Sequence, residues 1–262
     1  MTVLQAPSIT KPPPGSTGAV LVSGSHGGAY PGYLAACARV RGVIFNDAGV
    51  GKDDAGIGSL VYLQSLGIPA ATVDHRTARI GDCEDMLVNG RVSRYNAVAA
   101  RFGVDEGMGC AEAARRLEQS RMFRVTPPDH PEARVVLRNA PRRLVLMDSA
   151  SLVAPNDAGG IVVTGSHGGI FGNDPTVALR VEALAALFND AGIGKDGAGV
   201  TRLPALERRG IAAATVAAMS ARIGDARSTL EDGVLSRVNE RAAALGAEVG
   251  MAARVFVEKL LA

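Results

Sequence analysis

A short polar segment, Gly-Ser-His-Gly-Gly, occurs twice in the sequence, at positions 24–28 and 165–169. Each copy holds a hydroxyl that could attack a carbonyl group and an imidazole that could exchange a proton. Neighbouring side chains rarely face each other, so we expect the serine of one copy to meet the histidine of the other across an interface. The glycine amides are expected to hold an anion or a carbonyl oxygen; the alternative is a turn whose serine caps a helix and whose histidine makes a structural hydrogen bond. The candidate residues are Ser25, His26, Gly27, Gly28, Ser166, His167, Gly168 and Gly169.

A second repeated segment, Asn-Asp-Ala-Gly-x-Gly-Lys-Asp, lies at 46–53 and at 189–196. It is not a phosphate-binding P-loop, because that motif requires glycine where the chain has Asn46 and serine or threonine where it has Asp53. Its lysine could act as a general base, or could hold a substrate carboxylate or phosphate as a fixed positive charge. The alternative is an ion pair with a nearby aspartate that only fixes the loop. The candidate residues are Asn46, Asp47, Lys52, Asn189, Asp190 and Lys195.

A third repeated segment, Ala-Arg-Ile-Gly-Asp, lies at 78–82 and at 221–225. Its arginines, Arg79 and Arg222, either capture a substrate carboxylate or connect the two copies. Its aspartates, Asp82 and Asp225, are well placed to cap the following helix.

The two copies differ directly before this third segment. The first has Asp74-His75-Arg76-Thr77, whereas the second has Ala217-Ala218-Met219-Ser220. This difference favours one asymmetric site to which the first copy contributes His75 as a catalytic candidate. The alternative is that His75 is a partly exposed loop residue without a chemical role.

The three segments recur in the same order, which indicates an internal duplication. Ser166 follows Ser25 by 141 residues (166 minus 25), and Lys195 follows Lys52 by 143 residues (195 minus 52), so the second copy holds two extra residues between these motifs. A period of this length indicates two domain-sized halves, not an array of short repeats. We therefore expect a first α/β repeat at 1–120, a linker at 121–150 and a second α/β repeat at 151–262.

Strands and helices alternate in each half, a pattern typical of βαβ units and a mainly parallel sheet. Because right-handed crossovers place strand-to-helix loops on one edge of a sheet, the three motifs should converge there, where such sheets bind ligands. The fold class expected is thus two tandem, pseudo-twofold-related three-layer βαβαβα units with a β-hairpin between them. The expected strands are 19–22, 43–45, 70–73, 161–164, 186–188 and 213–216; the expected helices are 33–40, 53–66, 176–185 and 196–208, with further helices after Asp82 and Asp225; and the expected hairpin pairs 134–138 with 143–147.

Composition excludes several classes of function. A net charge of +2 gives no reason to expect nucleic acid or an acidic membrane as a partner, and an aromatic content of 4% without tryptophan argues against a base-stacking surface. No apolar run approaches the length of a membrane span, and the first sixteen residues do not resemble a secretory signal. Three cysteines make a disulfide framework or a zinc site improbable and fit the cytoplasm. We expect neither a cofactor nor a metal, although aspartate, asparagine and histidine at a sheet edge could hold Mg²⁺. A homo-oligomer is possible.

The leading hypothesis is a metal-independent hydrolase of a small polar or anionic substrate, such as an amide or cyclic amide. Ser25 or Ser166 would attack a carbonyl after losing its proton to Lys52 or Lys195, while loop amides hold the oxyanion. A first alternative is a lyase or isomerase in which paired lysines or histidines move protons. A second is a binding protein for a small carboxylate or phosphate metabolite.

Overall fold

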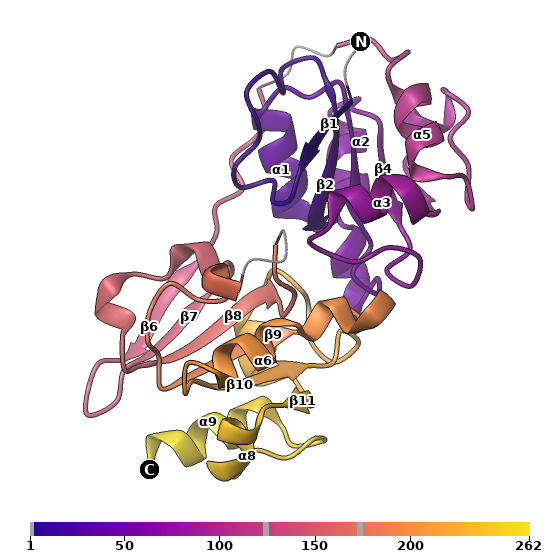
Figure 1. Cartoon of the computed structure of the whole chain (residues 1–262). Helices are drawn as coiled ribbons and strands as arrows, with labels where there is room; N and C mark the ends of the chain where they lie inside the picture. The colour runs from indigo at the N-terminus through magenta and orange to yellow at the C-terminus, as the bar shows by residue number, and fades with distance from the viewer. Residues whose placement is uncertain (1–2, 123–125, 172–174) are drawn as a thin grey trace.

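The chain forms two α/β units, each built around one mainly parallel sheet, as the sequence predicts (Figure 1). The computed structural model describes residues 3–122, 126–171 and 175–262. In the first sheet β1 to β4 run parallel in sequence order, and β5 adds an antiparallel edge. Its strands are β1 (Val3–Ala6), β2 (Val20–His26), β3 (Gly42–Asn46), β4 (Ala70–Val73) and β5 (Val92–Tyr95).

The second sheet repeats this order and adds one strand. Strands β7 to β10 are parallel in sequence order, and β6 and β11 are antiparallel edges. The strands are β6 (Arg134–Arg138), β7 (Leu144–Met147), β8 (Ile161–His167), β9 (Ala185–Asn189), β10 (Ala212–Val216) and β11 (Leu235–Val238). The expected hairpin is therefore present as β6 and β7, but it is part of the second sheet. Its strand β7 pairs with β8 as β1 pairs with β2.

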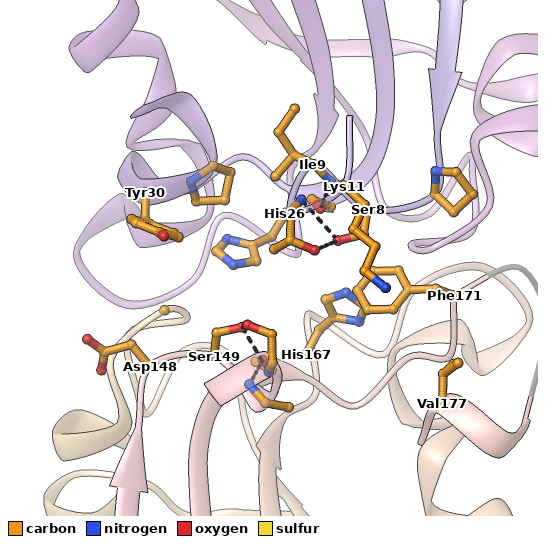
Figure 2. A pocket seen from close by; sticks show the side chains of 18 of the residues that line it. Ser8, Ile9, Lys11, His26, Tyr30, Asp148, Ser149, His167, Phe171 and Val177 are labelled. Carbon is orange, nitrogen blue, oxygen red and sulfur yellow. Dashed lines mark hydrogen bonds between the residues drawn. The ribbon is translucent and has the colours of Figure 1, made fainter. Parts of the chain in front are cut away.

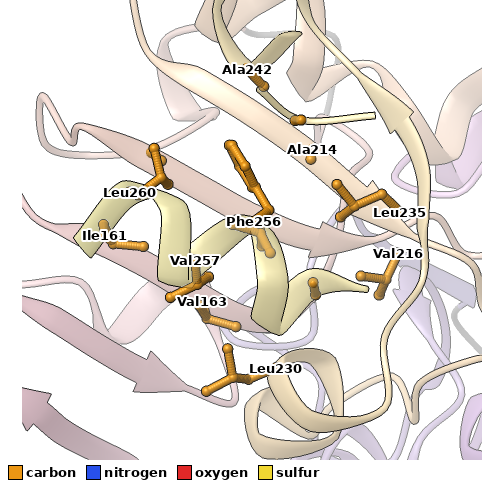
Figure 3. Packing of buried hydrophobic residues seen from close by; sticks show 14 of the residues in the cluster. Ile161, Val163, Ala214, Val216, Leu230, Leu235, Ala242, Phe256, Val257 and Leu260 are labelled. Carbon is orange, nitrogen blue, oxygen red and sulfur yellow. The ribbon is translucent and has the colours of Figure 1, made fainter. Parts of the chain in front are cut away.

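Helices cover both faces of each sheet, because the central strands are apolar on both sides. In the first unit Phe45 faces Leu63 of α2, whereas its neighbour Ile44 faces Met86 of α3. In the second unit Phe256 of α9 is fully buried on one face, in a cluster that includes Val163 and Val216 of the sheet (Figure 3). The helices are α1 (Ala29–Cys37), α2 (Ser59–Ser65), α3 (Cys83–Asn89), α4 (Ala97–Ala100), α5 (Cys110–Leu117), α6 (Arg202–Glu207), α7 (Ala226–Glu231), α8 (Glu240–Ala244) and α9 (Ala253–Leu261). The 3₁₀ turns are η1 (Lys52–Ile57), η2 (Ala150–Leu152), η3 (Pro155–Asp157), η4 (Pro175–Val177) and η5 (Lys195–Val200).

One expected helix, 176–185, is wrong. Only the short turn η4 forms there, and the chain then extends into β9. Arginine side chains take over the hydrogen bonds that a helix would make: Arg209 donates to the carbonyl oxygens of Leu179 and Val181, and Arg202 donates to that of Ala178.

A strand was also missed at the N-terminus. No strand is expected in the Pro-rich, polar segment before Ser16, yet β1 pairs there with β2 from Val3 to Ala6. The strand is so short that its alternation of apolar and polar residues does not stand out beside the prolines that follow it.

The two units meet through the loops that follow their strands (Figure 1). Backbone hydrogen bonds cross between them in equivalent pairs. The Lys52 N–H donates to the Ala218 carbonyl over 2.9 Å, and the Lys195 N–H donates to the His75 carbonyl over 2.8 Å. The second repeated segment of each half therefore docks onto the loop that follows β4 or β10 in the other half.

Glycines allow this docking to be close. A Cβ atom added to Gly49 would lie 2.9 Å from the Cα atom of Gly192, so no larger residue fits between the two loops. A small apolar cluster from both halves is buried beside them and consists of Ala48, Ile80, Ala191, Ala198 and Ile223.

Candidate functional site

A cavity of about 430 Å³ lies between the two halves (Figure 2). Both Gly-Ser-His-Gly-Gly loops line it, and so do the segments that follow β1 and β7. These segments are Ser8-Ile9-Thr10 and Ser149-Ala150-Ser151, which stand 141 residues apart, as the two Ser-His pairs do. The volume falls within the range of sites for small molecules.

Ser25 and Ser166 are held in the same way in each half. The Ser25 Oγ accepts a hydrogen bond of 3.1 Å from the Ile9 N–H, and the Ser166 Oγ accepts one of 2.9 Å from the Ala150 N–H. Within the described ranges neither hydroxyl donates to a protein group, so each can donate to a molecule in the cavity.

The two histidines present their Nε2 atoms as hydrogen-bond donors. The Nδ1 atom accepts a backbone N–H in both cases, from Gly28 to His26 at 3.2 Å and from Gly169 to His167 at 3.1 Å. A nitrogen that accepts carries no proton, so the neutral ring carries its proton on Nε2. The expected meeting of the two motifs is observed, because both histidines and both serines line this one cavity.

Burial keeps both rings neutral. It lowers the pKa of His26 to about 4 and that of His167 well below its ordinary 6.5, where the nearby positive charge of Arg202 adds to the effect. His167 is only 2% exposed, and its Nε2 atom has no hydrogen-bond partner among the described residues. An unsatisfied buried donor costs about 1–3 kcal/mol, which a bound acceptor would recover.

The motif glycines do not offer their amides to the cavity, contrary to expectation. Gly27 and Gly168 donate to the carbonyl oxygens of Asn46 and Asn189, and the next two glycines donate to the histidine rings. Gly28 and Gly169 lie so close to the histidine rings that a larger residue would not fit there. A Cβ atom on Gly28 would lie 2.8 Å from the His26 ring.

Arg202 is a buried cation at the cavity wall that sequence reasoning missed. It is the first residue of α6, is 3% exposed, and donates through Nε to the Gly169 carbonyl at 3.0 Å. Its guanidinium lies 5.6 Å from the ring of Phe171 and 5.1 Å from that of Phe188. No carboxylate of the described residues forms an ion pair with it. Burial lowers its pKa to about 10, so it remains charged at neutral pH.

Two carboxyl groups, also absent from the sequence-based candidates, lie in the same cavity. Asp148 accepts hydrogen bonds from the backbone N–H groups of Ala133 and Ala226, at 2.7 and 3.0 Å. Burial and the negative charge of Asp148 raise the pKa of Glu132 to about 7. Burial and the adjacent Glu132 in turn raise the pKa of the Tyr30 hydroxyl to about 12.

The lysines expected to activate the serines lie elsewhere. The Lys52 Nζ forms an ion pair of 2.8 Å with Asp232, and the Lys195 Nζ one of 2.6 Å with Asp85. Neither lysine lines the cavity. The expected Ser-Lys pair is thus not formed, because each lysine loop crosses to the opposite half and the amine is used there.

The arginines of the third segment connect the halves, which was one of the two expectations for them. Arg79 pairs with Asp196 at 2.9 Å, and Arg222 pairs with Asp53 at 3.0 Å. The caps predicted for the helices after them are confirmed: Asp82 accepts from the Asp85 N–H, and Asp225 accepts from the Ser228 N–H.

The asparagine and aspartate of the second segment fold their own loops. The side chain of Asn46 donates to the Ala78 carbonyl, and Asp47 accepts from the Gly49 and His75 N–H groups. In the second half the Asn189 side chain donates to the Ala221 carbonyl, and Asp190 accepts from Gly192 and Ala218. None of the four candidates lines the cavity.

His75 also lies outside the cavity, against Gly192 of the other half. Its Nδ1 lies 2.8 Å from Asp47, and the ligand atoms of Asp47, Asp74 and His75 lie within 4.8 Å of one another, as in a metal site. These atoms are already engaged, however. The Asp47 oxygen accepts two backbone N–H groups, and Arg76 binds Asp74 through both carboxylate oxygens.

Comparison with protein-family models, with curated proteins and with solved structures finds no match for this chain. In the part of the chain that the structure describes, no helix has both the length and the apolar character needed to cross a membrane.

Proposed function

We propose that this protein binds a small organic anion, a carboxylate above all, in the cavity between its halves. The observation that carries this proposal is Arg202, a buried guanidinium that lines the cavity without a carboxylate partner among the described residues. A buried charge without a counter-ion costs several kcal/mol. An anionic ligand would offset that cost. It would bind through Nη2, because Nε donates to the Gly169 carbonyl and Nη1 to those of Val177 and Ala178, whereas no described residue accepts from Nη2.

The neutral histidines support the same proposal. They place donor Nε2–H groups from both halves around one cavity, together with the free hydroxyl protons of Ser25 and Ser166. These groups can bind an anion as hydrogen-bond donors, without transferring a proton to it. We also infer that the halves are diverged copies of one duplicated unit, which explains why the donors come in equivalent pairs.

Titration calorimetry with butanoate, pentanoate and hexanoate tests the proposal. We expect the Arg202→Ser variant, which introduces the residue found at the equivalent position 59 of the first half, to bind at least tenfold more weakly than the wild type. Arg254→Ser removes the same charge from the exposed face of α9 and should leave affinity unchanged. Equal binding by wild type and Arg202→Ser would overturn the proposal.

Arg202 also supports the backbone, so a folding failure must be separated from a binding defect. A second measurement uses the wild type alone: the ¹⁵N and ¹H shifts of the His167 Nε2–H group should move on titration with each carboxylate. A ligand that binds without shifting this resonance would place the site elsewhere.

Hydrolysis of an amide or cyclic amide is the second candidate, and Glu132 is the observation that favours it. A carboxyl group whose pKa is about 7 can accept the proton of an attacking hydroxyl at neutral pH, and Glu132 shares the cavity with both serines. The neutral histidines would then stabilise the oxyanion. Turnover lost in Ser25→Ala or Ser166→Ala with binding retained would favour this candidate over binding alone.

Proton abstraction by paired histidines, the isomerase alternative, is disfavoured. Each Nδ1 accepts an amide N–H and each Nε2 carries the ring proton, so neither neutral ring has a free lone pair toward the cavity.

A further inference from the structure

We propose that the ligand of this cavity is a zwitterion, an ω-amino carboxylate whose acidic group lies at the Arg202 end and whose amino group lies between Glu132 and Asp148. This inference rests on the proposed anion site and specifies its ligand. It follows from how charge is distributed over a cavity whose centre is built alike by both halves.

The centre of the cavity is built from equivalent residues of both halves. Each half supplies a Ser-His pair and a Ser-x-Ser or Ser-x-Thr turn, and Tyr30 stands at the position equivalent to Phe171. A cavity with only these residues would accept a ligand in either direction. Direction comes from the positions at which the halves differ.

One end of the cavity is basic. Arg202 stands where the first half has Ser59, and Lys11 stands where the second half has Leu152. Arg180, two residues after Ala178, whose carbonyl accepts from Arg202, also lines the cavity. Arg202 is buried, whereas Lys11 and Arg180 are exposed at the rim. No ion pair joins any of the three to a carboxylate in the described ranges, so their positive charge is not neutralised by the protein there. Figure 2 shows Lys11 on the same side of the cavity as Phe171, whose ring contacts Arg202.

The opposite end is acidic. Asp148 stands where the first half has Pro7, and Glu132 comes from the segment before β6, which the first half lacks. Neither carboxyl group forms an ion pair with a cation among the described residues. Figure 2 places Asp148 and Tyr30 on the far side of the two histidines from Lys11 and Phe171. The two sets of charge are therefore separated and do not neutralise each other directly.

A zwitterion satisfies both ends at once. Two neighbouring carboxyl groups in a partly buried wall repel each other when ionised, and an ammonium group between them removes that repulsion. Apolar side chains such as Ile9, Leu34 and Leu179 line the cavity as well and suit the methylene chain of an ω-amino acid.

Calorimetry with matched probes tests this inference. The probes are 4-aminobutanoate, 5-aminopentanoate and 6-aminohexanoate, each compared with the carboxylate of the same length that lacks the amine. We expect at least one amino acid to bind tenfold or more tightly than its matched carboxylate. In Glu132→Gln and Asp148→Asn the advantage should disappear while the plain carboxylates still bind. The exposed Glu248→Gln serves as the charge-matched control and should keep the advantage.

The outcomes separate the two proposals. If the plain carboxylates bind and the amino acids bind no more tightly, the zwitterion is excluded and the anion site stands. If neither series binds, or if Arg202→Ser leaves both series unaffected, the anion site itself fails and the zwitterion fails with it.

Discussion

Arg202 begins α6 at the position that Ser59 occupies at the start of α2, and both side chains are buried. The hydroxyl of Ser59 has no partner in the described residues, whereas the guanidinium of Arg202 reaches the cavity. One substitution between equivalent helices thus gives one half a cation that the other lacks. This difference changes the charge at the cavity, whereas the sequence difference at His75 lies outside it.

The ion pairs of the two lysines should contribute to stability unequally. The carboxylate of Asp85, the partner of Lys195, is 2% exposed, whereas that of Asp232, the partner of Lys52, is 36% exposed. We expect Lys195→Met to lower the free energy of unfolding by about 2–4 kcal/mol, because the buried carboxylate of Asp85 keeps its hydrogen bonds but is left with Arg79, at 3.3 Å, as its remaining cation among the described residues. Lys52→Met should cost about 0–1 kcal/mol. Urea denaturation measures both.

Carboxylate affinity should be unchanged in both lysine variants that remain folded. If Lys52→Met or Lys195→Met instead removed binding or turnover without a loss of stability, the lysines would belong to the site after all.

The motifs and most strands were predictable because their signals are local. Runs such as Val43-Ile44-Phe45 and caps such as Asp82 depend only on nearby residues. The parallel sheets followed from the alternation of strands and helices. The same reasoning found the Ser-His loops, which do line the cavity.

The rest depends on how the two halves dock, which no local pattern specifies. The crossing of the Lys52 and Lys195 loops turned expected ligand groups into interface groups. Glu132 could not be found, because it lies in a segment without a motif. Arg202 could have been found by aligning the two halves. It stands opposite Ser59, and His75 was proposed from the same kind of difference between the halves.

Glu132 should make the stability of the unliganded protein depend on pH. Its pKa is about 7 in the folded state against 4.5 in the unfolded chain. Between these values the unfolded state loses its proton first, so this group lowers the stability as the pH rises from 4.5 to 7, and the loss persists above 7. Glu132→Gln cannot ionise. We therefore expect it to raise the free energy of unfolding at pH 8 relative to the wild type by about 1–3 kcal/mol, but to change it little at pH 4.

Urea denaturation of wild type and variant at the two pH values measures this difference. An equal effect of the substitution at pH 4 and pH 8 would contradict the raised pKa of Glu132.

The same group should couple amine binding to pH. An ammonium group favours the ionised form of Glu132. Burial and the negative charge of Asp148 disfavour that form, whereas hydrogen bonds from Tyr30 and Ser149 favour it. Binding of 5-aminopentanoate should therefore release a proton below pH 7, and its affinity should rise from pH 5.5 to pH 8 and then level off. Pentanoate lacks the amine and should not show this rise. Calorimetry in buffers of different ionisation enthalpy counts the proton, and in Glu132→Gln the release should vanish.

The state of the two histidines decides whether the cavity offers donors or bases. With Nδ1 of His26 and His167 accepting the amides of Gly28 and Gly169, both rings should be neutral Nε2–H tautomers at pH 7. Long-range ¹⁵N–¹H correlation spectra distinguish this form by the shift of the unprotonated Nδ1. His26 should resist protonation down to a pH of about 4, because its pKa lies there. Gly28→Ala would place a Cβ atom 2.8 Å from the His26 ring and should raise this pKa toward 6.5 as the ring is displaced toward solvent. A spectrum with the proton on Nδ1 at pH 7 would give the rings free lone pairs toward the cavity, and proton abstraction by paired histidines would then become the better account of the site.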